Sequence, residues 1–187
     1  MKMHNLLGGT LLMATLLTGF PAWASHGPTE VGGATMYPTN NIVENALNSG
    51  DHETLVAAIK AAGLVDTLQG EGPFTVFAPV DSAFNRLPSG TVPMLLKPEN
   101  KSQLQSVLTY HVVPGNMDRQ ALSEAVMKAG GSAQLETVNG AMLTVKKNGN
   151  NLVVEDNTGT VANISTYDVS QANGVIHVID RVLMPGS

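Results

Sequence analysis

Cysteine is absent from this 187-residue sequence, and aromatic and charged residues are scarce. Without cysteine the chain holds no disulfide, iron–sulfur cluster, thiol nucleophile or cysteine-type zinc site. Charged residues make up only 13% of the chain, which argues against a disordered acidic tail. Ten basic residues stand against 15 acidic ones. The resulting net charge of −5 argues against a nucleic-acid partner, because phosphate contacts need a basic face.

The common motifs of catalysis and metal binding are missing as well. The sequence has no phosphate-binding glycine loop, no Gly-x-Ser-x-Gly elbow, no His-Glu-x-x-His helix and no acidic calcium loop. A triad of Ser82, His111 and Asp81 is conceivable from the residue types, but Asp81 and Ser82 are better explained as the start of a helix. We therefore expect no enzyme activity, no cofactor and no metal.

Histidines are the remaining candidates for acid–base chemistry. His52 lies at a predicted helix start, where we expect it at the surface. His111 and His177 lie in apolar contexts, and we expect both imidazoles to be buried or half-buried with backbone hydrogen bonds.

Residues 1–24 have the pattern of a cleaved signal peptide. Lys2 precedes an apolar stretch from Leu6 to Phe20, and Ala22 and Ala24 supply the small residues of a cleavage site. The stretch is shorter than the roughly 20 residues that span a bilayer, although an uncleaved membrane anchor stays open. Cleavage leaves 163 residues with a net charge of −6. We expect a secreted or periplasmic protein without a membrane span after cleavage, of a size that allows a monomer.

The remaining chain divides into a leader and one domain. Residues 25–38 are rich in Gly, Pro and Thr, and we interpret them as a flexible leader. Residues 39–185 form the predicted domain. Its first half has helical spacing at residues 42–47, 55–62 and 104–110 and after Asp118. We expect Asp51, Asn100 and Asp118 to cap the helices that follow them.

Strand patterns dominate the second half of the domain. Asn139-Gly140 between two alternating segments predicts a hairpin, and turns follow at residues 148–151 and 156–159. The apolar run at residues 175–179 predicts a central strand buried on both faces. Helices followed by strands indicate an α+β fold.

Three segments in the same order resemble the fasciclin domain family. They are TVFAPVDSAFNRLP at residues 75–88, LTYHVVPG at residues 108–115 and NGVIHVIDRVLMP at residues 173–185. The resemblance covers about residues 39–185 and is to the single-domain secreted bacterial type. It implies a wedge-shaped α+β fold, in which a layer of helices covers a β-sandwich-like core of two sheets.

The resemblance also implies a function and candidate partner-binding residues. Members mediate adhesion at cell surfaces and in extracellular matrix. In animal members an Asp-Ile pair before the last Asn-Gly and the Tyr-His segment are implicated in integrin binding. The matching positions here are Asp168-Val169 and Tyr110-His111, with Val in place of Ile. An alternative is that these residues are scaffold and that Asp168 caps a turn.

Two functions follow as expectations. The first is an exported, non-enzymatic adhesion module that contacts a cell-surface or matrix protein or polysaccharide. The second is an extracellular carrier of an apolar, carotenoid-like small molecule, because some algal fasciclin-like proteins bind carotenoids and a groove lined by Met, Val and Leu could hold such a ligand.

Overall fold

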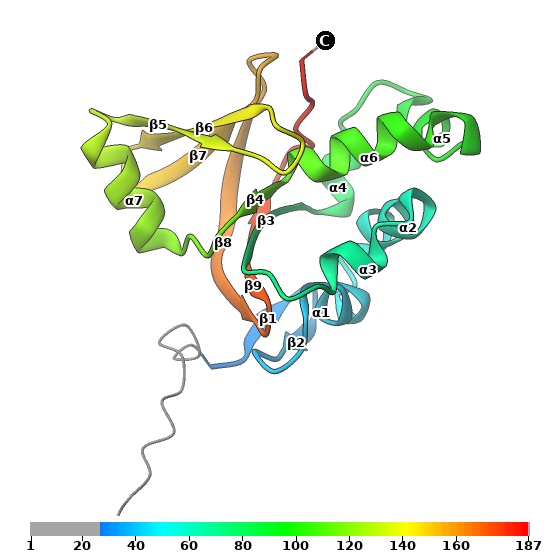
Figure 1. The fold of residues 1–187 in the computed structure, drawn as a ribbon, viewed down its shortest axis with the longest axis horizontal. Coiled ribbons are helices and arrows are strands. Elements are labelled where there is room, and N and C mark those ends of the chain that lie inside the picture. Colours follow the sequence, from blue (N-terminus) through cyan, green and yellow to red (C-terminus); the bar gives the residue numbers. More distant parts are fainter. Residues whose placement is uncertain (1–26, 187) are drawn as a thin grey trace, which may run out of the picture.

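The computed structural model describes residues 27–186, which fold into a seven-stranded sheet, a small hairpin and a layer of helices (Figure 1). The strands are β1 (Thr29–Val31), β2 (Ala34–Met36), β3 (Phe74–Pro79), β4 (Val112–Pro114), β5 (Ser132–Glu136), β6 (Met142–Asn148), β7 (Asn151–Glu155), β8 (Val161–Gln171) and β9 (Gly174–Ile179). The helices are α1 (Ile42–Asn48), α2 (Glu53–Ala62), α3 (Val65–Leu68), α4 (Asp81–Phe84), α5 (Thr91–Leu95), the 3₁₀ helix η2 (Pro98–Asn100), α6 (Lys101–Tyr110) and α7 (Arg119–Lys128). The predicted α+β class is confirmed.

The predicted signal peptide, residues 1–24, lies outside the described residues. Within residues 27–186, no helix has the length and apolar character needed to cross a membrane.

The seven-stranded sheet consists of two halves that share the long strand β8. Its order is β4-β3-β9-β8-β7-β6-β5, and every neighbouring pair is antiparallel except β3 and β9. Residues 161–163 of β8 pair with β7, whereas residues 164–171 pair with β9 across two register shifts. Such irregularities bend a strand. The predicted two-sheet core is therefore present as two halves of one bent sheet.

The outer strands approach each other closely enough to make the sheet nearly barrel-like. The backbone N–H of Val138, two residues after β5, donates to the Val112 oxygen in β4 at 2.8 Å. The enclosed side chains include Phe77, Leu143 and Ile179, all fully buried. Each such side chain stabilises the fold by about 1.5–3 kcal/mol.

Strand β9 is covered on both faces, as its apolar run predicts. All six of its residues are buried. Ile176 and Val178 pack with the buried residues of α1, α2 and α6, whereas Ile179 packs inside the near-barrel. Figure 1 shows these helices on one side of β3 and β9 and the strands β5–β7 on the other.

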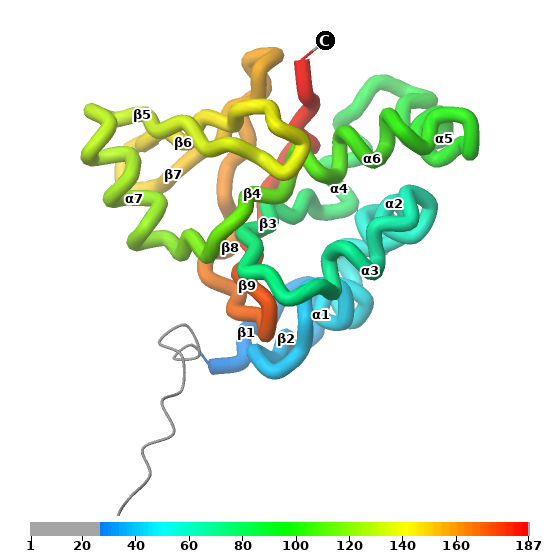
Figure 2. Tube along the Cα trace, in the orientation of Figure 1, coloured from blue at the N-terminus to red at the C-terminus, as the bar shows by residue number. Residues whose placement is uncertain are grey.

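The prediction of a flexible leader over residues 25–38 is wrong for residues 29–36, which form a β-hairpin. Strands β1 and β2 pair around Gly32-Gly33, whose φ angles are +60° and +73°. Positive φ at both turn residues is typical of a two-residue type I′ hairpin and favours glycine. Val31 and Met36 are buried in the same cluster as α1, which lies beside the hairpin (Figure 2). The folded unit therefore begins before residue 39.

A distant residue caps the N-terminus of α2. The sequence predicts Asp51 as the cap, but no side chain from the residues just before α2 provides one. Instead, the Asp81 carboxylate accepts hydrogen bonds from the backbone N–H groups of Thr54 at 2.8 Å and Glu53 at 3.3 Å. Asp81 is itself the first residue of α4 and does not cap that helix. Its carboxylate therefore joins the helical layer to the end of β3.

Two further local predictions are wrong because tertiary contacts prevail. The Asn100 side chain does not cap α6 but donates to the Met94 oxygen at 2.7 Å. His52 is buried rather than exposed, and its Nδ1 lies 2.8 Å from the Ser49 hydroxyl. The cap predicted at Asp118 is confirmed, because its carboxylate accepts from the Ala121 N–H at 2.8 Å.

The capping role of Asp81 predicts a stability difference between two aspartates. Asp81→Ala leaves two N–H groups of α2 without an acceptor and should lower the free energy of unfolding by about 1–2 kcal/mol, as for loss of an N-cap. Asp51→Ala is the matched control and should change it by less than about 0.5 kcal/mol. Urea unfolding measures both. An Asp51→Ala loss equal to or larger than that of Asp81→Ala would contradict the assignment.

Candidate functional site

Tyr110 and His111, two of the four predicted partner-binding residues, lie in the interior at the end of α6. Tyr110 is 0% exposed, and its hydroxyl donates to the Met142 oxygen at 2.8 Å and accepts from the Asn157 N–H at 3.2 Å. These bonds join α6 to the start of β6 and to the turn after β7. The Tyr110 side chain is therefore a structural tie, with no surface for a partner to contact in this conformation.

His111 joins α6 to the C-terminal segment of the chain. It is 3% exposed, with Nδ1 2.8 Å from the Val107 oxygen. Its Nε2 accepts from the Leu183 N–H at 3.0 Å, so Nδ1 carries the proton of the neutral ring. Burial lowers the pKa of His111 to about 4, against the opposing effect of the Val107 carbonyl. Both ring nitrogens are occupied by backbone groups, so the conceivable triad with Ser82 and Asp81 is not assembled.

Asp168 and Val169, the other two predicted residues, lie on β8 between the halves of the sheet. Val169 is 0% exposed and packs in the helix-facing core. Asp168 is partly exposed and has a φ of +57°, a left-handed conformation that non-glycine residues rarely adopt. Asp168 is thus the one predicted partner-binding residue with surface that a partner could reach.

A hydrogen bond to the buried His177 of β9 anchors the backbone of Asp168. The Asp168 N–H donates to His177 Nδ1 at 3.4 Å, and His177 Nε2 lies 2.8 Å from the Met117 oxygen, to which it donates. The Phe77 and Tyr167 rings lie 5.7 and 5.9 Å from the imidazole, centroid to centroid. Burial lowers the pKa of His177, while the Met117 carbonyl and the nearby carboxylates act in the opposite direction. His177 is therefore neutral near pH 7 and positions the Asp168 backbone.

Arg119, which the sequence analysis did not single out, lies directly beside Asp168. Its backbone N–H donates to Asp168 Oδ1 at 2.6 Å. Its guanidinium lies 4.6 Å from the Tyr167 ring centroid, and Nη2 donates to the Asn150 oxygen at 3.1 Å. Arginine over an aromatic ring is a favourable cation–π arrangement. No local motif marks Arg119, because its partners are 31 to 49 residues away in the sequence.

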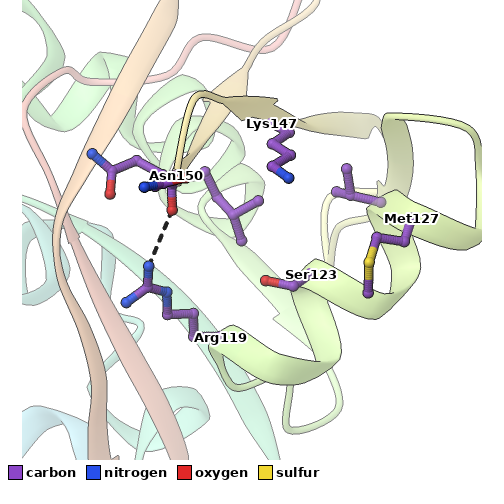
Figure 3. Close-up of a pocket in the computed structure, with 8 residues that line it drawn as sticks. Arg119, Ser123, Met127, Lys147 and Asn150 are labelled. Atoms are coloured by element: carbon purple, nitrogen blue, oxygen red, sulfur yellow. Dashed lines mark hydrogen bonds between the residues drawn. The ribbon is translucent and has the colours of Figure 1, made fainter.

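The Arg119 side chain borders a pocket of about 430 Å³ between α7 and the turn that joins β6 to β7. Its lining residues are Arg119, Ser123, Val126, Met127, Lys147, Asn150, Asn151 and Leu152. Figure 3 shows Arg119, Ser123 and Met127 on the helix and Lys147 and Asn150 across from them. Arg119 therefore connects the predicted site residue Asp168, through its backbone N–H, to this pocket, which its side chain lines. Tyr110 and His111 belong to the interior.

Two apolar cavities near the helical layer are small. One, between the helical layer and the sheet, is lined by residues such as Ile59, Leu108 and Ile176 and has a volume of about 20 Å³. A neighbouring one near Phe74 and Val138 has the same volume. Sites for drug-sized ligands span roughly 300–1,000 Å³. In this conformation neither cavity accommodates the carotenoid-like ligand of the carrier hypothesis.

Burial of neutral His111 predicts that the free energy of unfolding falls in mild acid. The unfolded chain takes up a proton at the ordinary pKa of 6.5, whereas folded His111 takes it up near pH 4. The contribution of neutral His111 to the free energy of unfolding is therefore complete above pH 6.5 and decreases as the pH falls toward 4. The decrease is about 3 kcal/mol for this group. Urea unfolding between pH 7 and 4 measures the loss. His111→Gln cannot titrate and should show a shallower pH dependence; an identical dependence in both proteins would refute the assignment.

Comparisons with known proteins agree with the resemblance seen in the sequence. The fasciclin domain pattern matches residues 50–185. Protein sll1483 of Synechocystis sp. is 46% identical over 182 residues, covering 91% of this chain and 93% of that protein. Immunogenic protein MPB70 of Mycobacterium bovis is 37% identical over 164 residues, covering 85% of this chain and 75% of that protein.

Among solved structures, a FAS1 domain pair from the insect cell adhesion molecule Fasciclin I has a similar fold. The TM-score is 0.55 at 24% sequence identity, and the match covers 70% of this chain and 44% of that two-domain chain. Sequence pattern, relatives and fold agree, and the chain belongs to the fasciclin domain family.

Proposed function

We propose that this protein is an exported, non-enzymatic adhesion module that binds a cell-surface or extracellular-matrix component. Family membership supports adhesion, since the solved domain pair with this fold comes from a cell adhesion molecule. The signal-peptide pattern of residues 1–24 supports export. The observation that carries the proposal is the placement of Asp168. Its side chain is partly exposed, and its backbone N–H is hydrogen-bonded to the buried His177.

Asp168 is suited to binding a partner because hydrogen bonds to His177 and Arg119 already fix its conformation. The Arg119 N–H engages only Oδ1, and no described residue hydrogen-bonds to Oδ2. The Oδ2 oxygen is therefore available to a donor on a partner. Because His177 and Arg119 already fix the residue, little conformational entropy is lost when the partner binds.

Binding to the producing cells and to their extracted matrix tests this proposal. The chain from Ser25 to Ser187 should bind saturably, and Asp168→Asn should weaken binding at least tenfold. Asn keeps an oxygen for the Arg119 N–H and tolerates positive φ, so this variant removes the charge without disturbing the fold. Asp66→Asn, at an exposed site on α3, is the charge-matched control and should bind like the wild type.

Absence of saturable binding by the wild-type chain would contradict the adhesion proposal. Equal binding by the wild type and Asp168→Asn would contradict the role of Asp168. Thermal unfolding of each variant shows whether a loss of binding follows from a loss of folding.

If the protein is exported and its signal peptide is cleaved, the exported form has one defined N-terminal residue. Signal peptidase cleaves after small residues, so the exported protein should begin at Ser25 and contain 163 residues. Mass spectrometry of the protein from periplasm and medium checks this expectation. A full-length chain retained in the membrane fraction would instead support the uncleaved anchor.

A further inference from the structure

The pocket between α7 and the β6–β7 turn concentrates positive charge on an acidic protein. Arg119 lines it from the helix and Lys147 from the sheet, in a chain whose net charge is −5. Within residues 27–186, neither the Arg119 guanidinium nor the Lys147 ammonium forms an ion pair with a carboxylate. Lys146 and Lys128, the basic neighbours on β6 and α7, both pair with glutamates. Two cations that form no ion pair with a described residue, both beside one concave surface, favour an anionic ligand.

The Arg119 guanidinium is held ready for such a ligand. It lies over the Tyr167 ring at 4.6 Å, and one N–H is fixed by the Asn150 oxygen. Tyr167 is itself anchored, because its hydroxyl accepts from the Leu152 N–H at 2.9 Å and donates to the Leu152 oxygen at 3.2 Å. The other guanidinium N–H groups donate to no described residue. Arginine binds carboxylates through paired N–H groups, and a fixed guanidinium loses little entropy on doing so.

The rest of the lining indicates the chemistry of the ligand. Ser123, Asn150 and Asn151 offer neutral hydrogen-bonding groups, while Val126 and Leu152 supply an apolar floor. Lys147 extends from the sheet toward α7 in Figure 3. A uronic acid has a group for each part of this lining. Its carboxylate matches the two cations, its hydroxyls match the neutral polar groups, and its C–H face matches the apolar floor. A fatty acid would need a longer apolar wall than these residues provide. The volume of about 430 Å³ lies within the roughly 300–1,000 Å³ range of small-molecule sites.

We propose that this pocket binds a uronate unit of an acidic polysaccharide. Arg119 and Lys147 bind the carboxylate, and Ser123 and the two asparagines bind ring hydroxyls. The inference rests on the proposed adhesive function and names its partner class, an acidic polysaccharide of the cell surface or matrix.

Calorimetric titration of the chain from Ser25 with tri-galacturonate tests the inference, with the methyl-esterified trimer as the neutral probe. The free acid should bind, and the ester should bind at least tenfold more weakly. Raising the salt concentration should weaken binding of the acid, because exposed charges are screened. Equal binding of acid and ester, or binding of neither, would overturn the proposal.

Charge variants place the binding in the pocket. Lys147→Met removes an exposed charge that makes no ion pair with a described residue, and it should weaken binding of tri-galacturonate at least fivefold. Lys60→Met, an exposed lysine on α2, is the matched control and should have no effect. Amide resonances of Ser123 and Asn150 should shift during the titration. Equal affinities of wild type and Lys147→Met would overturn the assignment to this pocket.

A competition experiment separates failure of this inference from failure of the adhesion proposal. If the chain binds extracted matrix and tri-galacturonate displaces it, the inference is supported. If it binds matrix and tri-galacturonate displaces none of it, the inference fails while adhesion stands. If it binds no matrix, the adhesion proposal fails, and the inferred partner class fails with it.

Discussion

The domain depends on the burial of β9 between two layers. Strand β9 pairs in parallel with β3, and at the first position the two backbones are so close that a Cβ on Gly174 would overlap the Phe74 oxygen. Only glycine fits there. The preceding Asn173 extends the same constraint into the helical layer, since its side chain accepts from the Ile42 N–H at 3.1 Å and donates to the Leu68 oxygen at 2.8 Å. The Asn-Gly pair of the third family segment thus fixes both the central strand and the helices over it.

The same strand shapes the surface that carries the proposed function. His177 faces the near-barrel interior from β9 and holds the Asp168 backbone through Nδ1. Asp168 in turn accepts from the first residue of α7, Arg119, whose guanidinium reaches the β6–β7 turn through Asn150. A chain of contacts therefore runs from the buried strand to the basic pocket. Hydrogen bonds join each member to the next, so Asp168 is connected to the pocket through Arg119.

Local sequence patterns predicted the elements whose causes are local. The Asn139-Gly140 hairpin, the cap at Asp118 and the buried run of β9 were confirmed because turn chemistry, capping and periodicity act over a few residues. The hairpin at residues 29–36 was missed although Gly32-Gly33 signals it, because the Gly-rich composition was interpreted as flexibility. The cap supplied by Asp81 and the basic pocket could not be found locally. Their partners are tens of residues away and meet only in the folded chain.

We propose that partner contacts converge on Asp168, α7 and the β6–β7 turn. The most direct measurement is a backbone-amide NMR titration of the ¹⁵N-labelled chain from Ser25 with polysaccharide extracted from the producing cells. We predict that shifts and broadening concentrate in residues 118–127, 147–152 and 167–168, while α1, α2 and α3 stay unchanged. Perturbation of α1–α3 instead, or no perturbation at a polysaccharide concentration that saturates matrix binding, would contradict this binding surface.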